Sequence, residues 1–230
     1  MPSTPLKLLS SMAAREVLRD LIERYRLSSG QIVNAEAAGG VDVAKRVRAG
    51  EAVDVVVLAR NAIDQLIAEA KLLEGSRVDL ARSGVAIAVR TGAAKPDIAS
   101  EAAVRQAVLG AKSLSYSTGP SGVHLEKLFE RWGILDQVRP RIVVPAPGVP
   151  VGSLVASGKA ELGFQQLSEL MGVAGLEVLG PLPAAIQSIT TFSGGISVAS
   201  STPEAARALL DYMASSAGHD VKRRYGMEAA

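Results

Sequence analysis

The chain has 230 residues, of which 48% are hydrophobic and only 3% aromatic, and its formal net charge is +2. This length fits one large domain or two small ones, with a core built mainly from Ala, Val, Leu and Ile. The near-neutral charge, without a basic cluster interleaved with aromatic residues, argues against a nucleic-acid partner. The absence of cysteine excludes disulfides and thiolate metal sites.

The sequence also sets expectations about compartment and ligands. No apolar stretch reaches the length of a membrane span, so we expect no membrane insertion. His124 and His219 are isolated, and we expect neither a metal site nor a cofactor. The N-terminus has one lysine and an apolar part that merges at once into a predicted strand, unlike a signal peptide. We therefore expect a periplasmic protein if a signal peptide has been removed, and a cytoplasmic one otherwise.

Short apolar runs alternate with amphipathic stretches along the whole chain. The pattern predicts strands at 6–9, 31–36, 54–58, 84–90, 113–116, 141–145, 161–164, 176–179 and 188–199. It predicts helices at 13–27, 41–49, 61–70, 100–110, 122–132, 149–157, 166–171, 203–215 and 218–225, with Thr202 and Pro203 marking the start of one of them. The run VDVVVLA is apolar on both faces, as in buried parallel strands. This alternation predicts an α/β fold with parallel sheets.

Two extended regions are too long for one compact strand. The region 79–90 carries Ser83–Gly84 in its middle, and the region 185–199 is broken at Gly194–Gly195. We interpret them as two strands that cross between lobes, and a single continuous sheet is the alternative.

Two crossings divide the chain into a discontinuous lobe and a continuous one. We expect lobe one to comprise 1–81 and 189–230, and lobe two to comprise 82–188. A cleft between such lobes, lined by helix N-termini, is a common place for a small ligand.

Small residues occupy three predicted junctions between a strand and the following helix. They are Ser10 and Ser11, Gly39 and Gly40, and the stretch from Ser117 through Ser121 to Gly122. Such junctions offer backbone N–H groups and hydroxyls at helix N-termini, where the helix dipole favours an anion. Asp42 lies in the first turn of the second helix, and its charge would oppose an anion there.

Four segments, in this order and spacing, resemble the type II periplasmic solute-binding proteins, in particular the molybdate-binding protein and its relatives. They are the opening strand with Ser10–Ser11, RAGEAVDV at 48–55, PSG at 120–122 and SGKAELG at 157–163. The resemblance covers nearly the whole chain. It implies a type II fold with two Rossmann-like lobes joined by two crossover strands, acting as a monomer.

The chain also departs from the molybdate binders. Gln166 stands where they usually have a tyrosine that contacts the oxyanion, and Leu58 stands where a serine is usual. The segment 180–195 is more similar to a side branch that includes proteins like aconitate isomerase. The ligand implied is therefore a small anion, either an organic acid or a molybdate-like oxyanion.

The junctions and the resemblance together give the candidate ligand-binding residues. They are Ser10, Ser11, Gly39, Gly40, Arg60, Ser117, Ser121, Gly122, Gly148, Val149 and Gln166. Arg60 follows the third strand, and its guanidinium matches a carboxylate bidentately.

Two functions remain open. The first is a solute-binding protein that captures a small anion for the membrane subunits of an ABC importer. The second is an aconitate isomerase-like enzyme acting on a small polycarboxylate with the same fold. Isomerisation needs a base, for which His124 and Glu36 are the candidates.

Overall fold

The computed structural model describes residues 4–146 and 148–230. The described residues form two compact units, one of 4–83 with Thr191–Ala230 and one within Gly84–Thr190. We call them unit 1 and unit 2. The boundaries expected from the sequence, after residues 81 and 188, lie beside these divisions.

Unit 1 is built around a mixed sheet, in which antiparallel strands join the parallel ones that the sequence predicts. Its strands are β1 (Leu6–Ser11), β2 (Val33–Ala38), β3 (Val55–Ala59), the first part of β4 (Val78–Arg90), most of β8 (Ile189–Ile196) and β9 (Glu228–Ala229). They follow the order β2-β1-β3-β8-β4, with β9 paired to β4. β1 is parallel to β2 and β3, whereas β8 runs antiparallel to β3.

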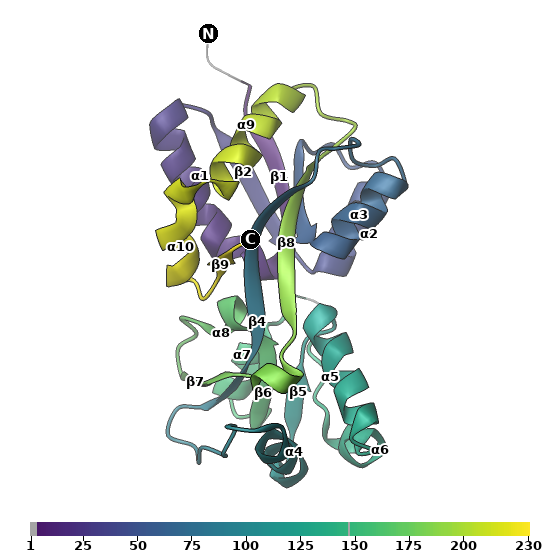
Figure 1. The fold of residues 1–230 in the computed structure, drawn as a ribbon, viewed down its shortest axis with the longest axis vertical. Coiled ribbons are helices and arrows are strands. Elements are labelled where there is room, and N and C mark those ends of the chain that lie inside the picture. Colours follow the sequence, from purple (N-terminus) through teal and green to yellow (C-terminus); the bar gives the residue numbers. More distant parts are fainter. Residues whose placement is uncertain (1–3, 147) are drawn as a thin grey trace. The chain divides into compact units, whose positions relative to one another are not determined.

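Helices cover both faces of this sheet (Figure 1). They are α1 (Arg15–Ser29), α2 (Gly40–Arg48), α3 (Arg60–Ala68), α9 (Pro203–Ala214) and α10 (His219–Arg224). Because strand side chains alternate, Leu6 and Leu8 pack with α1, α9 and α10, and Leu9 packs with α2 and α3. As predicted, α9 begins with Pro203 after Thr202.

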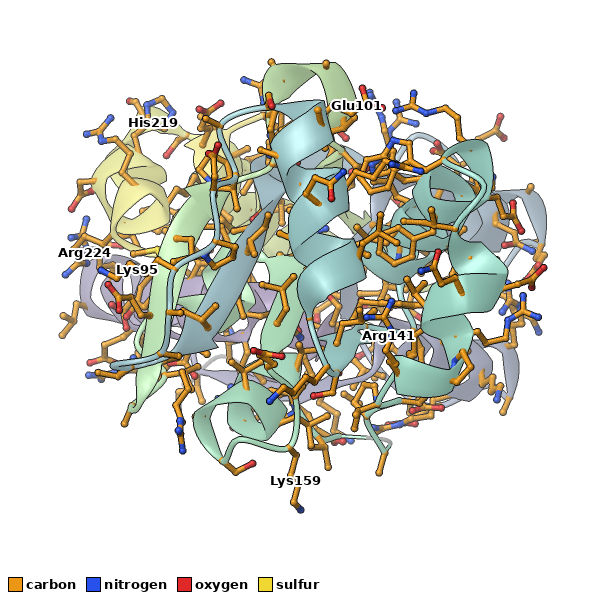
Figure 2. The ribbon with its side chains drawn as sticks, turned by 90° about the horizontal axis from the view of Figure 1, so that it is seen from below. Lys95, Glu101, Arg141, Lys159, His219 and Arg224 are labelled. Atoms are coloured by element: carbon orange, nitrogen blue, oxygen red, sulfur yellow. The ribbon has the colours of Figure 1, made fainter. Side chains whose placement is uncertain are left out.

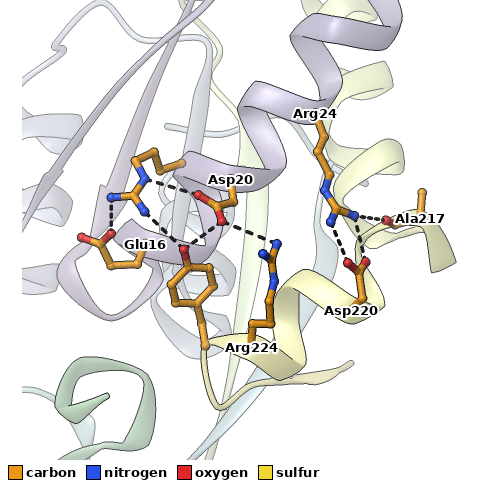
Figure 3. A network of polar contacts seen from close by, with 8 residues as sticks. Glu16, Asp20, Arg24, Ala217, Asp220 and Arg224 are labelled. Carbon is orange, nitrogen blue, oxygen red and sulfur yellow. Dashed lines mark hydrogen bonds and ion pairs between the residues drawn. The ribbon is translucent and has the colours of Figure 1, made fainter. Parts of the chain in front are cut away.

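Polar contacts tie α1 to the C-terminal part of the chain (Figure 3). The Arg24 guanidinium donates to both oxygens of Asp220, at 2.8 and 2.6 Å. The Tyr225 hydroxyl donates to Asp20 at 2.8 Å and accepts from Arg19 at 3.2 Å. These pairs fix α10 against α1, beside the apolar contacts of the same helices.

Unit 2 has a smaller sheet. It contains the second part of β4, β5 (Leu114–Tyr116), β6 (Leu162–Gln166) and β7 (Leu176–Pro181). β6 lies between β4 and β5 and is parallel to β5, and β7 also pairs with β4. The helices are α4 (Glu101–Gly110), α5 (Pro120–Arg131), α6 (Leu135–Val138), α7 (Val151–Ala156) and α8 (Leu167–Leu170). Among them, α4, α5 and α6 cover one face around Phe129 and Phe164.

Side chains fix both ends of α4, where Glu101 and Arg141 lie (Figure 2). At its start, Glu101 accepts from the Trp132 indole at 2.6 Å and from Arg131 at 2.7 Å. At its end, Arg141 donates to the carbonyls of Leu109 and Ala111, which have no partner within the helix.

The glycines expected to interrupt the long strands instead give room for packing. β4 and β8 are both continuous. A Cβ on Gly194 would lie 2.2 Å from Leu210 Cδ2, and one on Gly195 would lie 2.7 Å from Leu72 Cδ1. A Cβ on Gly84 would lie 3.1 Å from Nε2 of Gln187, whose amide bonds the backbone N–H and carbonyl of Val85.

One predicted strand is not formed. In the region 141–145, only Ile142 makes an isolated bridge, to Leu114, before the chain leaves the sheet. Pro145 cannot donate a ladder hydrogen bond, so the apolar run there does not extend into a strand. The short β9 was not predicted, because two residues carry no periodic pattern.

Candidate functional site

The three parallel strands of unit 1 end at one edge of its sheet, which we call the unit 1 edge. Ser11 closes β1, Ala38 closes β2 and Ala59 closes β3. α2 begins at Gly40, after Gly39 as N-cap, and α3 begins at Arg60. In α/β sheets, ligands bind beyond these carboxyl ends.

Ser11, Gly40 and Leu58 converge at this edge. A Cβ on Gly40 would lie 3.8 Å from Ser11 Cβ and 3.7 Å from Leu58 Cδ2. Ser11 is 8% exposed, and its hydroxyl is buried without a hydrogen-bond partner. Buried hydroxyls are normally satisfied, so this one is available for a ligand.

Ser10 faces the other side of the sheet. Strand alternation places it on the α1 face, where it lines a groove together with Arg15, Arg19 and Glu36. Ser10 and Ser11, predicted as a pair, therefore point to opposite faces.

The start of α2 combines donors with a negative charge. The N–H groups of its first turn have no intrahelical partner. A Cβ on Gly39 would lie 3.1 Å from Asp42 Oδ2, so the carboxylate of Asp42 folds back over the helix start. That charge disfavours a dianion held by α2 alone.

Arg60 supplies a cation at the unit 1 edge. Its Nη2 lies 2.8 Å from Asp79 Oδ2, and the side chain is 48% exposed. Ser193, which is fully buried, donates to Asp79 Oδ1 at 2.7 Å. Sequence reasoning singled out Arg60 but neither of these partners, which come from strands far along the chain.

In unit 2, β5 and β6 end at a second edge. The hydroxyls of Ser117 and Ser121 are 2.7 Å apart, and the Gly119 N–H donates to Ser117 Oγ at 3.3 Å. Gln166 closes β6, is 3% exposed, and donates through Nε2 to Thr190 Oγ1 at 2.8 Å. Its Oε1 is buried without a partner, so an acceptor is left open at this edge.

Two of the expected backbone donors in unit 2 have internal partners. The Gly122 N–H donates to the Gly119 carbonyl and the Val149 N–H to the Ala146 carbonyl, both at 3.0 Å. A Cβ on Gly122 would lie 1.6 Å from the Ser117 carbonyl oxygen, so packing requires this glycine. Gly148 has φ +77°, a left-handed conformation that favours glycine.

The two candidate bases differ in their surroundings. His124, the fifth residue of α5, has Nε2 2.9 Å from the Ile186 carbonyl oxygen. A carbonyl only accepts, so Nε2 carries a proton and Nδ1 of the neutral ring can accept one. Glu36 is largely exposed and pairs with Arg46 at 2.5 and 3.0 Å. These bonds lower the pKa of Glu36, which makes it a weaker base.

A further candidate base, the carboxyl of Glu169, was not predicted from the sequence. Glu169 in α8 accepts from Gln165 Nε2 at 2.8 Å, and burial raises the pKa of Glu169 to about 7. Gln165 Oε1 is buried without a partner. No sequence signal marks this pair, because desolvation depends on tertiary packing.

Residues 4–146 and 148–230 contain neither a cluster of metal ligands nor a membrane-spanning helix. No group of three or more His, Asp or Glu side chains there could hold a metal ion. Over the same ranges, every helix is too short or too polar to cross a membrane.

Known proteins match this chain over nearly its full length. The family model of the bacterial extracellular solute-binding proteins matches residues 6–228. Aconitate isomerase from a Pseudomonas species is 39% identical over 219 residues, covering 93% of this chain and 84% of that protein.

Solved structures share the fold at lower identity. The periplasmic molybdate-binding protein of Azotobacter vinelandii superimposes with a TM-score of 0.80 at 21% identity, covering 96% of this chain and 98% of that one. A ferric binding protein from Campylobacter jejuni gives 0.70 at 14% identity, covering 97% and 86%. The predicted α/β architecture of the type II periplasmic binding proteins is thus confirmed. The chain belongs to the bacterial extracellular solute-binding protein family.

Proposed function

We propose that this protein binds a small organic polycarboxylate and isomerises it by moving its double bond. The observation that supports this most is the make-up of the unit 1 edge. Arg60 supplies a cation, Ser11 supplies an unpartnered hydroxyl and Leu58 supplies an apolar wall. The 39% identity with a protein named aconitate isomerase supports the same ligand class, a small tricarboxylic acid.

A small organic carboxylate fits the unit 1 edge better than a metal oxyanion. A tetrahedral dianion can be held by neutral donors alone, whereas a carboxylate recruits the arginine fork. Leu58 is 1% exposed and removes a hydroxyl donor, which suits a carbon skeleton. In unit 2, Gln166 separately leaves an open acceptor, Oε1, which would repel a fully ionised oxyanion but accept from a ligand hydroxyl or a protonated carboxyl.

Isomerisation of an unsaturated tricarboxylic acid is a proton transfer between carbons. A base removes a proton from the methylene carbon, the double bond shifts, and a proton is returned to the former alkene carbon. We assign the base to Nδ1 of His124, because the Ile186 carbonyl fixes the proton on Nε2. No electrons are gained or lost, so the step needs no oxidant or reductant.

Proton NMR of trans-aconitate incubated with the protein in deuterated water tests the proposal. We expect conversion to the cis isomer, with deuterium entering the carbon that gains a proton. A His124→Gln variant keeps a donor for the Ile186 carbonyl and removes the base. It should bind trans-aconitate as the wild type does and convert it at least a hundredfold more slowly. Full activity in this variant would contradict the assignment.

The family match favours a second candidate, capture of a small anion for an ABC importer. In that case the protein is periplasmic, its partners are the importer's membrane subunits, and the ligand is released unchanged. Calorimetry against citrate, the aconitates and molybdate distinguishes the candidates. Tight binding of a carboxylate without conversion supports transport, and submicromolar binding of molybdate alone contradicts the carboxylate proposal.

A further inference from the structure

The Arg60 side chain is held at one nitrogen and open at the others. Nη2 contacts Asp79 Oδ2 at 2.8 Å, and the side chain is 48% exposed. Within the described residues, Arg60 makes no other ion pair or side-chain hydrogen bond. A guanidinium has five N–H donors in a rigid plane, so the rest of the fork can take a carboxylate.

Asp79 is itself held in place by a buried serine of β8. Its Oδ1 accepts from the hydroxyl of Ser193 at 2.7 Å, and Ser193 is fully buried in β8. The register pairs Ser193 with Leu58 of β3, two residues before Arg60. Asp79 Oδ2 thus contacts Arg60, while the nearest partner of Oδ1 is the buried hydroxyl of Ser193.

The neighbouring charges leave this arrangement intact. Arg77 lies 3.7 Å from Asp79 Oδ1 but forms its shorter ion pair with Asp64. Arg77 is divided between Asp64 and Asp79, whereas Arg60 contacts Asp79 through Nη2 alone, which leaves the other donors of Arg60 free. An exposed ion pair adds little stability, and a role in orienting Arg60 accounts better for the buried Ser193 contact.

We propose that Asp79, held by Ser193, is a positioning residue that fixes Arg60 for bidentate capture of a ligand carboxylate. The proposal rests on the proposed function, because it assumes a carboxylate ligand at the unit 1 edge. It adds that Asp79 orients the guanidinium of Arg60 before the ligand binds, as residues surrounding a metal site orient the metal's ligands. It also explains selectivity, since an oxyanion held by neutral donors would not depend on Asp79.

Calorimetry with trans-aconitate measures the coupling between the two residues. Arg60→Gln should weaken binding tenfold or more. Asp79→Asn keeps the shape and an acceptor for Ser193 but removes the charge, and should weaken binding about fivefold. In the double variant the second change should add nothing. Asp64→Asn, which removes the partner of Arg77 instead, is the matched control and should bind like the wild type. Unchanged or tighter binding by Asp79→Asn, or an equal loss in the Arg60→Gln background, would overturn the proposal.

A second measurement needs no ligand. The Arg60 Nε–H resonance, assigned by its absence in Arg60→Gln, should report a restrained side chain in the wild type and in Asp64→Asn. In Asp79→Asn it should report a mobile one. Equal mobility in all three proteins would overturn the positioning role. A wild type that binds no polycarboxylate but shows the expected mobility change would contradict the proposed function alone.

Discussion

Two buried serines of unit 1 differ in what their hydroxyls do. Ser11 Oγ has no partner, whereas Ser76 Oγ accepts from the Ile196 N–H at 3.1 Å. Ser11→Ala should leave the free energy of unfolding unchanged and weaken trans-aconitate binding by about 1 kcal/mol, roughly fivefold in Kd. Ser76→Ala should leave binding unchanged and destabilise the protein by about 1–3 kcal/mol, because a buried N–H loses its acceptor. Calorimetry and urea unfolding measure both quantities, and unaltered affinity in Ser11→Ala would argue against a ligand at this hydroxyl.

Lys222 is 1% exposed, and its Nζ is buried without a partner. Burial lowers the pKa of Lys222 from its usual 10.5. Between the two pKa values the unfolded chain binds more protons, so this residue makes stability rise with pH up to about 10.5. Lys222→Met should therefore stabilise the protein by about 1–3 kcal/mol near neutral pH, with the gain vanishing at high pH. Urea unfolding at several pH values checks this. A destabilised variant would mean that the amine has a favourable role in the fold.

Glu169 makes the stability of the protein depend on pH in the opposite direction to Lys222. Burial raises the pKa of Glu169 to about 7, above its usual 4.5. A raised carboxyl pKa means that stability is fully present below the unfolded pKa and is lost as the pH rises through 7. Glu169→Gln should remove this loss, which is at most about 3 kcal/mol from the size of the shift. Comparison of the two unfolding free energies at about pH 5 and pH 8 tests it. An equal pH dependence in both proteins would place the titration elsewhere.

The helices that begin at the two edges depend on glycine for different reasons. A Cβ on Gly122 would overlap the Ser117 carbonyl at 1.6 Å, whereas one on Gly40 would make ordinary contacts at 3.7 and 3.8 Å. Gly122→Ala should cost roughly 2–3 kcal/mol of stability. Gly40→Ala should keep or slightly raise stability and weaken ligand binding tenfold or more, because the methyl group would fill the space beside Ser11. Thermal unfolding and calorimetry separate the two effects. Full affinity in Gly40→Ala would move the ligand away from α2.

At the level of elements, the sequence was informative where the pattern was local. The apolar alternation predicted most helices and strands, and Pro203 marked the start of α9. The errors came from tertiary packing. The extended region 185–199 is interrupted in its pattern at Gly194 and Gly195, but these glycines make room for Leu210 and Leu72 inside a continuous β8. The sequence alone does not show which side chains will pack against a glycine.

For the whole molecule, the fold followed from the sequence more fully than the candidate site did. The order of small residues at strand ends pointed to the edges where Ser11, Gly40 and Gln166 lie. It could not give the partners of Arg60. Asp79 and Ser193 lie on β4 and β8, and only the strand order of the sheet brings them to α3. Burial without partners, as at Ser11, is likewise a property of the packed state.

The discontinuity of unit 1 has a consequence for how the chain folds during its synthesis. Residues 84–190 form unit 2 without interruption, whereas β8 enters the unit 1 sheet between β3 and β4 from near the end of the chain. On the ribosome, unit 2 can be completed while β3 still lacks its neighbour. A fragment of residues 84–190 should unfold cooperatively, and a fragment of residues 1–190 should show that transition alone. A second transition in the longer fragment would contradict this order. Until residues 191–230 have been synthesised, β3 therefore keeps an unpaired edge. The N-terminal part of unit 1 is thus the part of the nascent chain that most needs a chaperone.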